Sequence, residues 1–97
     1  MAKKGYWVVN YRSVSNPGAV ADYVKFVGPR LGDLGGRTIV AGMPAKTIEA
    51  GMEQTVVVVE FDSVERAIAA CESDEYKAAL KIFNNGAQRD FRIVEGF

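Results

Sequence analysis

The pattern of hydrophobic and polar positions predicts strands and helices in a definite order along the chain. Hydrophobic runs typical of strands cover residues 5–12, 37–42, 53–61 and 90–97, and helical spacing covers residues 17–34 and 64–83. Residues 43–51 are expected to form a hairpin arm, with a short strand at 45–49. The order β-α-β-β-α-β is the ferredoxin-like arrangement, in which helices cover one face of an antiparallel sheet. We therefore expect a single α+β domain over residues 1–97.

Residues at the ends of the helical segments indicate where each helix begins or is interrupted. Gly28 and Pro29 interrupt the first helical stripe, so we expect a kink there or a break into two short helices. Asp62 with Glu65 matches an acidic variant of the capping box and is expected to begin the next helix. Ser73 is a good N-cap and is expected to begin a third helical stripe.

Two predicted strands are hydrophobic on both faces, although helices can cover only one. Residues 56–59 are four consecutive valines, and successive side chains of a strand point to opposite faces. The run 5–9 is also hydrophobic on both faces. An uncovered face of this kind would exceed the apolar patch that monomers usually expose. We therefore predict a face-to-face homodimer whose interface buries on the order of 800 Å² per partner.

The composition argues against several classes of partner. Twelve basic side chains balance twelve acidic ones, so no charge excess favours nucleic acid or an anionic membrane. Asn10 and Arg12 break the first hydrophobic run too early for a signal peptide or a membrane helix. The element order also fits RNA-recognition modules, but residues 56–59 are valines where such modules need aromatic side chains. A single cysteine, Cys71, cannot form an internal disulfide and indicates a reducing cytoplasm.

The chain contains no histidine, and this absence limits its chemistry. A Ser-His-Asp or Cys-His catalytic device is excluded, and the commonest general base is missing. With one cysteine and no histidine as ligands, we expect no metal site. The usual haem ligand is missing as well, and we expect no bound cofactor. Catalysis would depend on carboxylates, tyrosine, lysine, arginine, a borrowed cofactor or the reactivity of the substrate itself.

Glu60 and Arg37 are the candidate catalytic residues. Glu60 ends the valine strand on the face shared with two of the valines, where a carboxylate needs a cationic partner or stays protonated. As a catalytic pair, Glu60 would shuttle a proton, and Arg37, directly after the glycines at 35–36, would hold an anionic group. The alternative, which the pattern favours, is an ion pair of Glu60 with Arg37, Arg12 or Arg92 on a neighbouring strand.

Tyr11, Tyr23, Tyr76 and Arg89 are the candidate ligand-binding residues. With Glu60 and Arg37 they would line a small, mostly apolar pocket between the sheet and the helices. In a chain without histidine, a tyrosine hydroxyl is an available proton donor. The alternative for Tyr23 and Tyr76 is core packing on helical stripes, with each hydroxyl reaching a partner. The alternative for Arg89 is a structural role in the turn into the last strand.

Four short motifs carry a resemblance to a known family by their order and spacing. They are "GGR" at 35–37, "VEF" at 59–61, "SDEY" at 73–76 and "IVEG" at 93–96. Nearly the whole chain is similar to the family called domain of unknown function 1330, which has no established activity. The resemblance implies the dimeric α/β-barrel class, in which two ferredoxin-like sheets face each other and the helices lie outside. The wider class includes cofactor-free monooxygenases, small isomerases, haem enzymes and ligand-binding regulators.

The chain departs from this family at two places. Ala70 and Cys71 stand where typical members carry an aromatic pair, and Phe83 stands where many carry an arginine. The comparison with typical members implies a pocket that is wider near residues 64–72 and less basic near Phe83.

Two functions remain open. One is cofactor-independent isomerisation or monooxygenation of a small organic molecule, and the other is a non-catalytic ligand-binding or structural homodimer. Glu60 separates them, because catalysis requires it to face a cavity, whereas a structural role requires it to be closed against an arginine.

Overall fold

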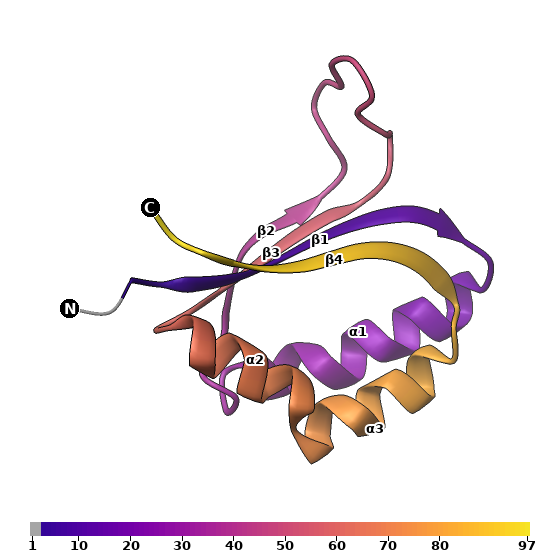
Figure 1. Ribbon diagram of the computed structural model, residues 1–97. Coiled ribbons are helices and arrows are strands. Elements are labelled where there is room, and N and C mark those ends of the chain that lie inside the picture. The colour runs from indigo at the N-terminus through magenta and orange to yellow at the C-terminus, as the bar shows by residue number, and fades with distance from the viewer. Residues whose placement is uncertain (1–2) are drawn as a thin grey trace.

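The computed structural model describes residues 3–97, and their secondary structure follows the predicted order (Figure 1). The strands are β1 (Gly5–Val14), β2 (Arg37–Gly42), β3 (Val56–Phe61) and β4 (Ala87–Glu95). The helices are α1 (Pro17–Leu31), α2 (Val64–Glu72) and α3 (Asp74–Phe83). None of these helices has the length and hydrophobicity that crossing a membrane requires, within the residues described.

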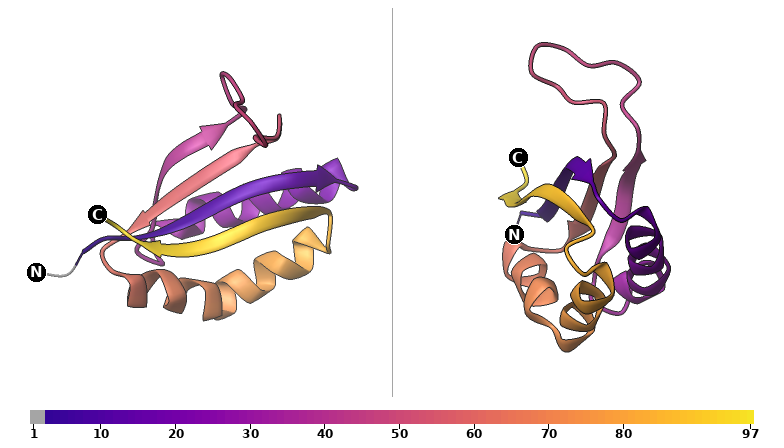
Figure 2. Two further views of the ribbon diagram at one scale, coloured as in Figure 1. Left: turned by 45° about the horizontal axis from the view of Figure 1, so that its top comes forward. Right: turned by 90° about the vertical axis from the view of Figure 1, so that its right-hand side faces the viewer.

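The four strands form one antiparallel sheet in the order β2-β3-β1-β4. All three helices lie on the same side of it, and the opposite face carries no helix (Figures 1 and 2). This arrangement confirms the predicted ferredoxin-like α+β fold. The two sheet faces are named here the helix face and the open face.

The hydrophobic core lies between the helix face and the helices. Trp7, Val59 and Phe61 are among its most buried side chains, with exposed fractions of 2%, 1% and 1%. The indole of Trp7 packs 5.0 Å from the ring of Phe61, and its Nε1 donates a hydrogen bond of 2.8 Å to the Ala67 carbonyl. The polar tip of the tryptophan is therefore satisfied inside the core, as buried indoles require.

Helix α1 continues through Gly28 and Pro29 to Leu31, so the predicted break is wrong. A proline removes one hydrogen bond of the helix, and here it does so only in the last turn, where little of the helix remains to be disrupted. A glycine turn follows the helix, where Gly35 has φ 86° and the Gly36 amide donates to the Leu31 carbonyl.

The N-cap of α2 is Ser63 and not Asp62, which corrects the predicted capping box. The Ser63 hydroxyl accepts a hydrogen bond of 3.2 Å from the Arg66 amide, whereas Asp62 contacts Lys4 Nζ at 3.3 Å. The N-cap predicted at Ser73 is confirmed, since its hydroxyl accepts from the Tyr76 amide at 3.2 Å.

Residues 43–55 form a long loop between β2 and β3 that projects away from the sheet (Figure 1). No strand forms at 45–49 within this described loop, so that prediction is wrong. Met43, Ile48 and Met52 are exposed here, with exposed fractions of 62%, 71% and 51%. The arm therefore lacks the buried partner that a strand pair needs to be stable.

Candidate functional site

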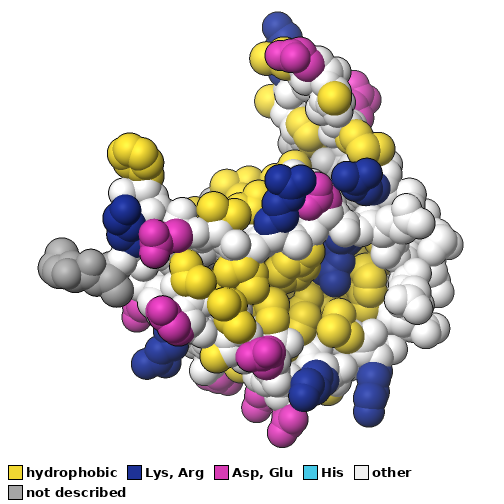
Figure 3. All heavy atoms as spheres, in the orientation of Figure 1, with side chains coloured by type: hydrophobic (Ala, Val, Ile, Leu, Met, Phe, Trp, Pro, Cys, Tyr) yellow, Lys and Arg dark blue, Asp and Glu magenta, His cyan; other side chains and the backbone are white. Residues whose placement is uncertain are grey.

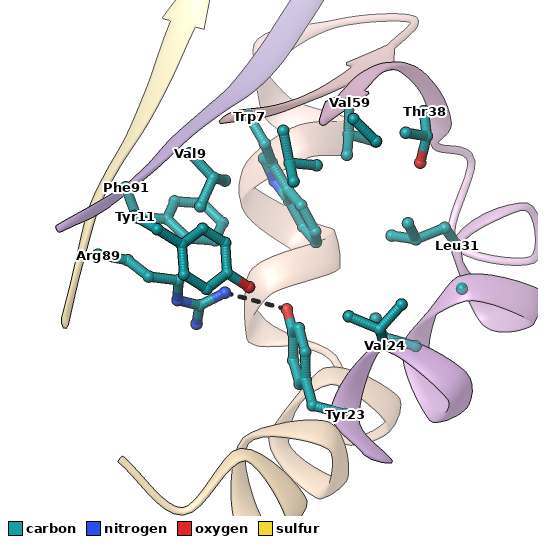
Figure 4. Close-up of a pocket in the computed structure, with 14 residues that line it drawn as sticks. Trp7, Val9, Tyr11, Tyr23, Val24, Leu31, Thr38, Val59, Arg89 and Phe91 are labelled. Atoms are coloured by element: carbon teal, nitrogen blue, oxygen red, sulfur yellow. Dashed lines mark hydrogen bonds between the residues drawn. The ribbon is translucent and has the colours of Figure 1, made fainter. Parts of the chain in front are cut away.

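A cavity of about 140 Å³ lies between α1 and the helix face of the sheet (Figure 4). Helix α2 packs directly on β1, β3 and β4, whereas α1 packs mainly against α3. Space therefore remains between α1 and the strands, beside Gly28 on the helix and Ala41 on β2. Engineered cavities of roughly 150 Å³ hold a benzene molecule, so this volume suits a single small ring.

The walls of the cavity are largely hydrophobic. They come from every strand and from α1, and include Val9, Val27, Leu31, Val57 and Val59. The strand register explains the wall, because Val57 is paired with Val9 and Ala41, and Val59 with Trp7 and Thr38. Each of these cross-strand rows points to the helix face.

Polar side chains meet at one end of the cavity. Arg89 Nη1 donates to the Tyr23 hydroxyl at 3.2 Å, and Arg89 Nη2 donates to the Tyr76 hydroxyl at 3.4 Å. The two hydroxyls are 3.0 Å apart and share a hydrogen bond. Tyr11 is the register partner of Arg89 across β1 and β4, and its phenol lies beside the guanidinium (Figure 4). Three of the four predicted ligand-binding residues, Tyr11, Tyr23 and Arg89, line the cavity, and Tyr76 supports two of them from α3.

Aromatic rings surround the Arg89 guanidinium. Its central carbon lies 4.1 Å from the ring centroid of Phe83, 5.2 Å from that of Tyr23 and 5.4 Å from that of Phe91. No aspartate or glutamate forms a salt bridge with Arg89 among residues 3–97. Arg89 on β4 therefore places a positive charge next to Phe83.

Burial affects the ionisable groups near this end. It raises the pKa of Tyr11, and burial with the neighbouring Tyr23 raises that of Tyr76 above its ordinary value. Both phenols are therefore protonated at neutral pH and can donate hydrogen bonds. Burial also raises the pKa of the Cys71 thiol to about 11, so the thiol is protonated too and a poor nucleophile.

Glu60 and Arg37 are not part of this cavity, which corrects their predicted place in the lining. Glu60 alternates with the buried Val59 and therefore points to the open face. Its register partners are Arg37 on β2 and Tyr6 on β1. The Tyr6 hydroxyl donates to Glu60 Oε2 at 3.0 Å. Oε1, which is shielded from solvent, has no hydrogen bond of regular geometry and forms an ion pair with the Arg37 guanidinium.

The ion pair proposed as the alternative for Glu60 is therefore present. Further ion pairs lie on the same face, where Asp90 contacts Arg12 at 3.5 Å and Arg92 at 2.8 Å. The hydrogen bonds from Arg92 lower the pKa of Asp90, so the carboxylate stays ionised. The charges of this face are thus paired within the chain.

Several residues of the cavity carry no signal in the sequence that marks them as site residues. Thr38, Val24 and Phe91 line it, yet they belong to ordinary strand and helix patterns with no distinctive motif. Arg89 lies within β4 and not in a turn, and the alternation Arg89, Phe91, Ile93 carries its side chain to the helix face. That alternation was the available signal, but Arg89 lies one residue before the start of the predicted strand at residue 90.

The fold and the pocket between its layers define an α+β protein of the ferredoxin-like class. The chain belongs to the family described as domain of unknown function (DUF1330), which matches residues 4–97. No curated protein matches it.

Among solved structures, the chain is similar to a protein of unknown function from Rhodopseudomonas palustris, with 16% sequence identity, a TM-score of 0.75, and 100% of this chain and 85% of that chain covered. It is also similar to a dimeric protein of unknown function and ferredoxin-like fold from Bacteroides fragilis, with 12% identity, a TM-score of 0.64 and 96% of each chain covered. SnoaB, a cofactor-independent oxygenase from Streptomyces nogalater, has 7% identity and a TM-score of 0.67, with 99% and 95% covered. At these identities the similarity shows the fold alone.

Proposed function

We propose that the protein binds a small organic molecule in the cavity between α1 and the sheet. The observation that carries this proposal is an apolar cavity with a cluster of polar groups at one end only, formed by Arg89, Tyr11 and Tyr23. Apolar walls with a few convergent polar groups are the usual composition of a ligand site. The volume of about 140 Å³ is smaller than that of most drug-sized sites and restricts the ligand to roughly one ring.

Binding is supported better than proton abstraction. The lining contains phenols, a threonine hydroxyl and a guanidinium, but no carboxylate among the residues described. A general base would therefore be missing, and Glu60 lies on the other face of the sheet. The description of SnoaB as a cofactor-independent oxygenase supports a second candidate, monooxygenation of a substrate that supplies its own reactivity. In that reaction dioxygen would be the oxidant, with one oxygen atom entering the product and the other leaving as water. Tyr11 or Tyr23 would donate a proton to the leaving oxygen.

We also propose that the open face packs against a second copy of the chain. Val8, Val56 and Val58 are only partly covered there, and Val40 has an exposed fraction of 47%. A second copy would cover these side chains, and the Bacteroides fragilis protein of similar fold is described as dimeric.

The unpaired thiol of Cys71 is consistent with a reducing cytoplasm, the compartment we propose.

Ligand binding can be tested by filling the cavity. Gly28 lines it, and a Cβ atom built on this residue meets no atom within 4 Å. We expect Gly28→Leu to abolish the binding of small aromatic molecules, because the new side chain occupies their space. The reporter is the fluorescence of Trp7, the only tryptophan, whose ring lies at the wall.

A matched control is Gly32→Leu. Gly32 lies at the end of the same helix, also has open space for a side chain and does not line the cavity. It should bind as the parent protein does. Equal binding by the parent and Gly28→Leu would contradict the proposed site.

A further inference from the structure

We propose that the cavity selects small aromatic carboxylates and that Arg89 anchors the carboxylate. This inference rests on the proposed function and adds the chemical class of the ligand. It follows from the hydrogen-bonding capacity and the charge of the polar end.

Arg89 keeps unused donors. A guanidinium has five N–H groups. The structure uses one from Nη1 and one from Nη2, both towards tyrosine hydroxyls. The Tyr11 hydroxyl lies within reach of a third, so about two N–H groups remain for a ligand. A planar fork of this kind matches the two oxygens of a carboxylate.

The tyrosine pair also keeps a donor. Both hydroxyl oxygens accept from Arg89, and the pair shares one hydrogen bond, which uses one of the two hydroxyl protons. The other proton, on Tyr23 or Tyr76, has no acceptor among the described residues. The Tyr11 hydroxyl likewise has no side-chain or backbone acceptor among them, and it adds a second spare O–H. The polar end therefore has more hydrogen-bond donors than acceptors, and it would bind a ligand rich in acceptors.

The positive charge of Arg89 also favours an anionic ligand. Arg89 is permanently positive, lies partly buried among aromatic rings and has no acidic partner in residues 3–97. Removing a cation from water is unfavourable, and π contacts with Phe83 and Tyr23 offset only part of this. An anion that enters the cavity would neutralise the charge in a site of low dielectric constant, where the attraction is strong.

The walls of the cavity favour an aromatic ring as the apolar part of the ligand. Trp7 and Phe91 line the cavity with aromatic surface, and their ring centroids are 5.3 Å apart. Val27 and Leu31 face them from α1. Planar rings pack well against aromatic side chains, and the volume admits about one ring. A benzoate-sized anion fits both ends of the cavity.

The test compares benzoate with benzamide, a neutral molecule of nearly the same shape. Titrations follow Trp7 fluorescence and heat at neutral pH, with toluene as an apolar reference. We expect benzoate to bind about ten- to a hundred-fold more tightly than benzamide, the range for hydrogen bonds to charged groups. Added salt should weaken the binding of benzoate and leave that of benzamide unchanged.

Three variants assign the effect to residues. Arg89→Met should remove the preference for benzoate, and Arg89→Lys, which keeps the charge but not the fork, should retain part of it. Tyr11→Phe removes one hydroxyl without a change of volume and should weaken benzoate several-fold while leaving toluene unaffected. This variant keeps the test valid if Arg89→Met does not fold, a point that circular dichroism decides.

The outcomes separate the inference from the proposed function. If neither benzoate, benzamide nor toluene binds, the proposed ligand site itself is wrong. If toluene or benzamide binds as tightly as benzoate, the site exists but the selectivity for carboxylates is wrong, and Arg89 has a structural role among the aromatic rings. A preference for benzoate that survives Arg89→Met would also overturn the assignment of the anchor.

Discussion

The two faces of the sheet differ in whether their charged side chains have partners of opposite charge. On the open face, Glu60 is paired with Arg37, and Asp90 is paired with Arg12 and Arg92. Figure 3 shows basic and acidic side chains next to each other there. Below β4, the same view shows hydrophobic side chains with a basic one among them. On the helix face, the guanidinium of Arg89 meets phenols and aromatic rings but no carboxylate in the described chain.

The two faces therefore differ in which charges are available to a ligand. A carboxylate and a guanidinium that already neutralise each other gain little from a third charged group. A cation held only by neutral donors and π systems gains much more from an anion. The structural interpretation of Glu60 and the binding interpretation of Arg89 follow from one criterion, the presence of a counter-charge.

A charge placed on the open face should change the protein most. Val58 is flanked by Val8 and Val40 in the strand register, at the centre of the face proposed to pair with a second copy. Val58→Lys would bury a charge without a partner in that interface and should convert the dimer to a monomer. Sedimentation at micromolar concentration measures the change. A parent protein that is already monomeric would refute the proposed dimer.

The next effect compares two adjacent valines of β3. Val59 is 1% exposed on the helix face, and Val58 is only partly covered on the open face. Val59→Ala should lower the free energy of unfolding by about 2–3 kcal/mol, because it empties space in a packed core. Val58→Ala should cost less in the isolated subunit, and its effect should depend on protein concentration if the dimer forms. Urea unfolding at two concentrations provides both values.

A third test concerns the layer beneath the sheet. Because burial raises the pKa of Cys71 from 9.0 to about 11, less thiolate is present near neutral pH. We expect its reaction with a thiol reagent at pH 8 to be about a hundred-fold slower than in the unfolded chain. The rate should still rise between pH 9 and 11. A rate that reaches its plateau near pH 9 would show that the thiol is not buried in solution.

The smallest effect concerns the ion pair of the open face. The Arg37 side chain is 69% exposed, so solvent screens its attraction for Glu60, which is 15% exposed. Glu60→Gln should destabilise the protein by about 0.5–1 kcal/mol. Benzoate binding should not change, because the pair lies across the sheet from the cavity. Loss of benzoate binding in Glu60→Gln would show that Glu60 contributes to the ligand site.

The opposite outcomes for Arg37 and Arg89 show what could be predicted from sequence. Each arginine lies in a strand, and each was a candidate for the same pocket. The face on which a side chain lies follows from alternation once the strand is located, and Val59 locates it for Glu60. The last strand was expected to begin at residue 90, one residue after Arg89, whereas β4 begins at Ala87. Alternation along the predicted strand therefore could not assign Arg89 to a face. Strand boundaries are the least secure part of such predictions.

Periodicity, caps and the valine run determined the element order, the ferredoxin-like fold and the existence of two hydrophobic sheet faces. These features depend on neighbours in the chain, whose spacing is visible in the sequence. Tertiary structure alone decided the partners: Tyr11 beside Arg89, Tyr23 against Tyr76, and Glu60 against Arg37. It also decided that α1 leaves a cavity above it. Strand register and helix docking bring distant residues together, and local patterns do not encode those distances.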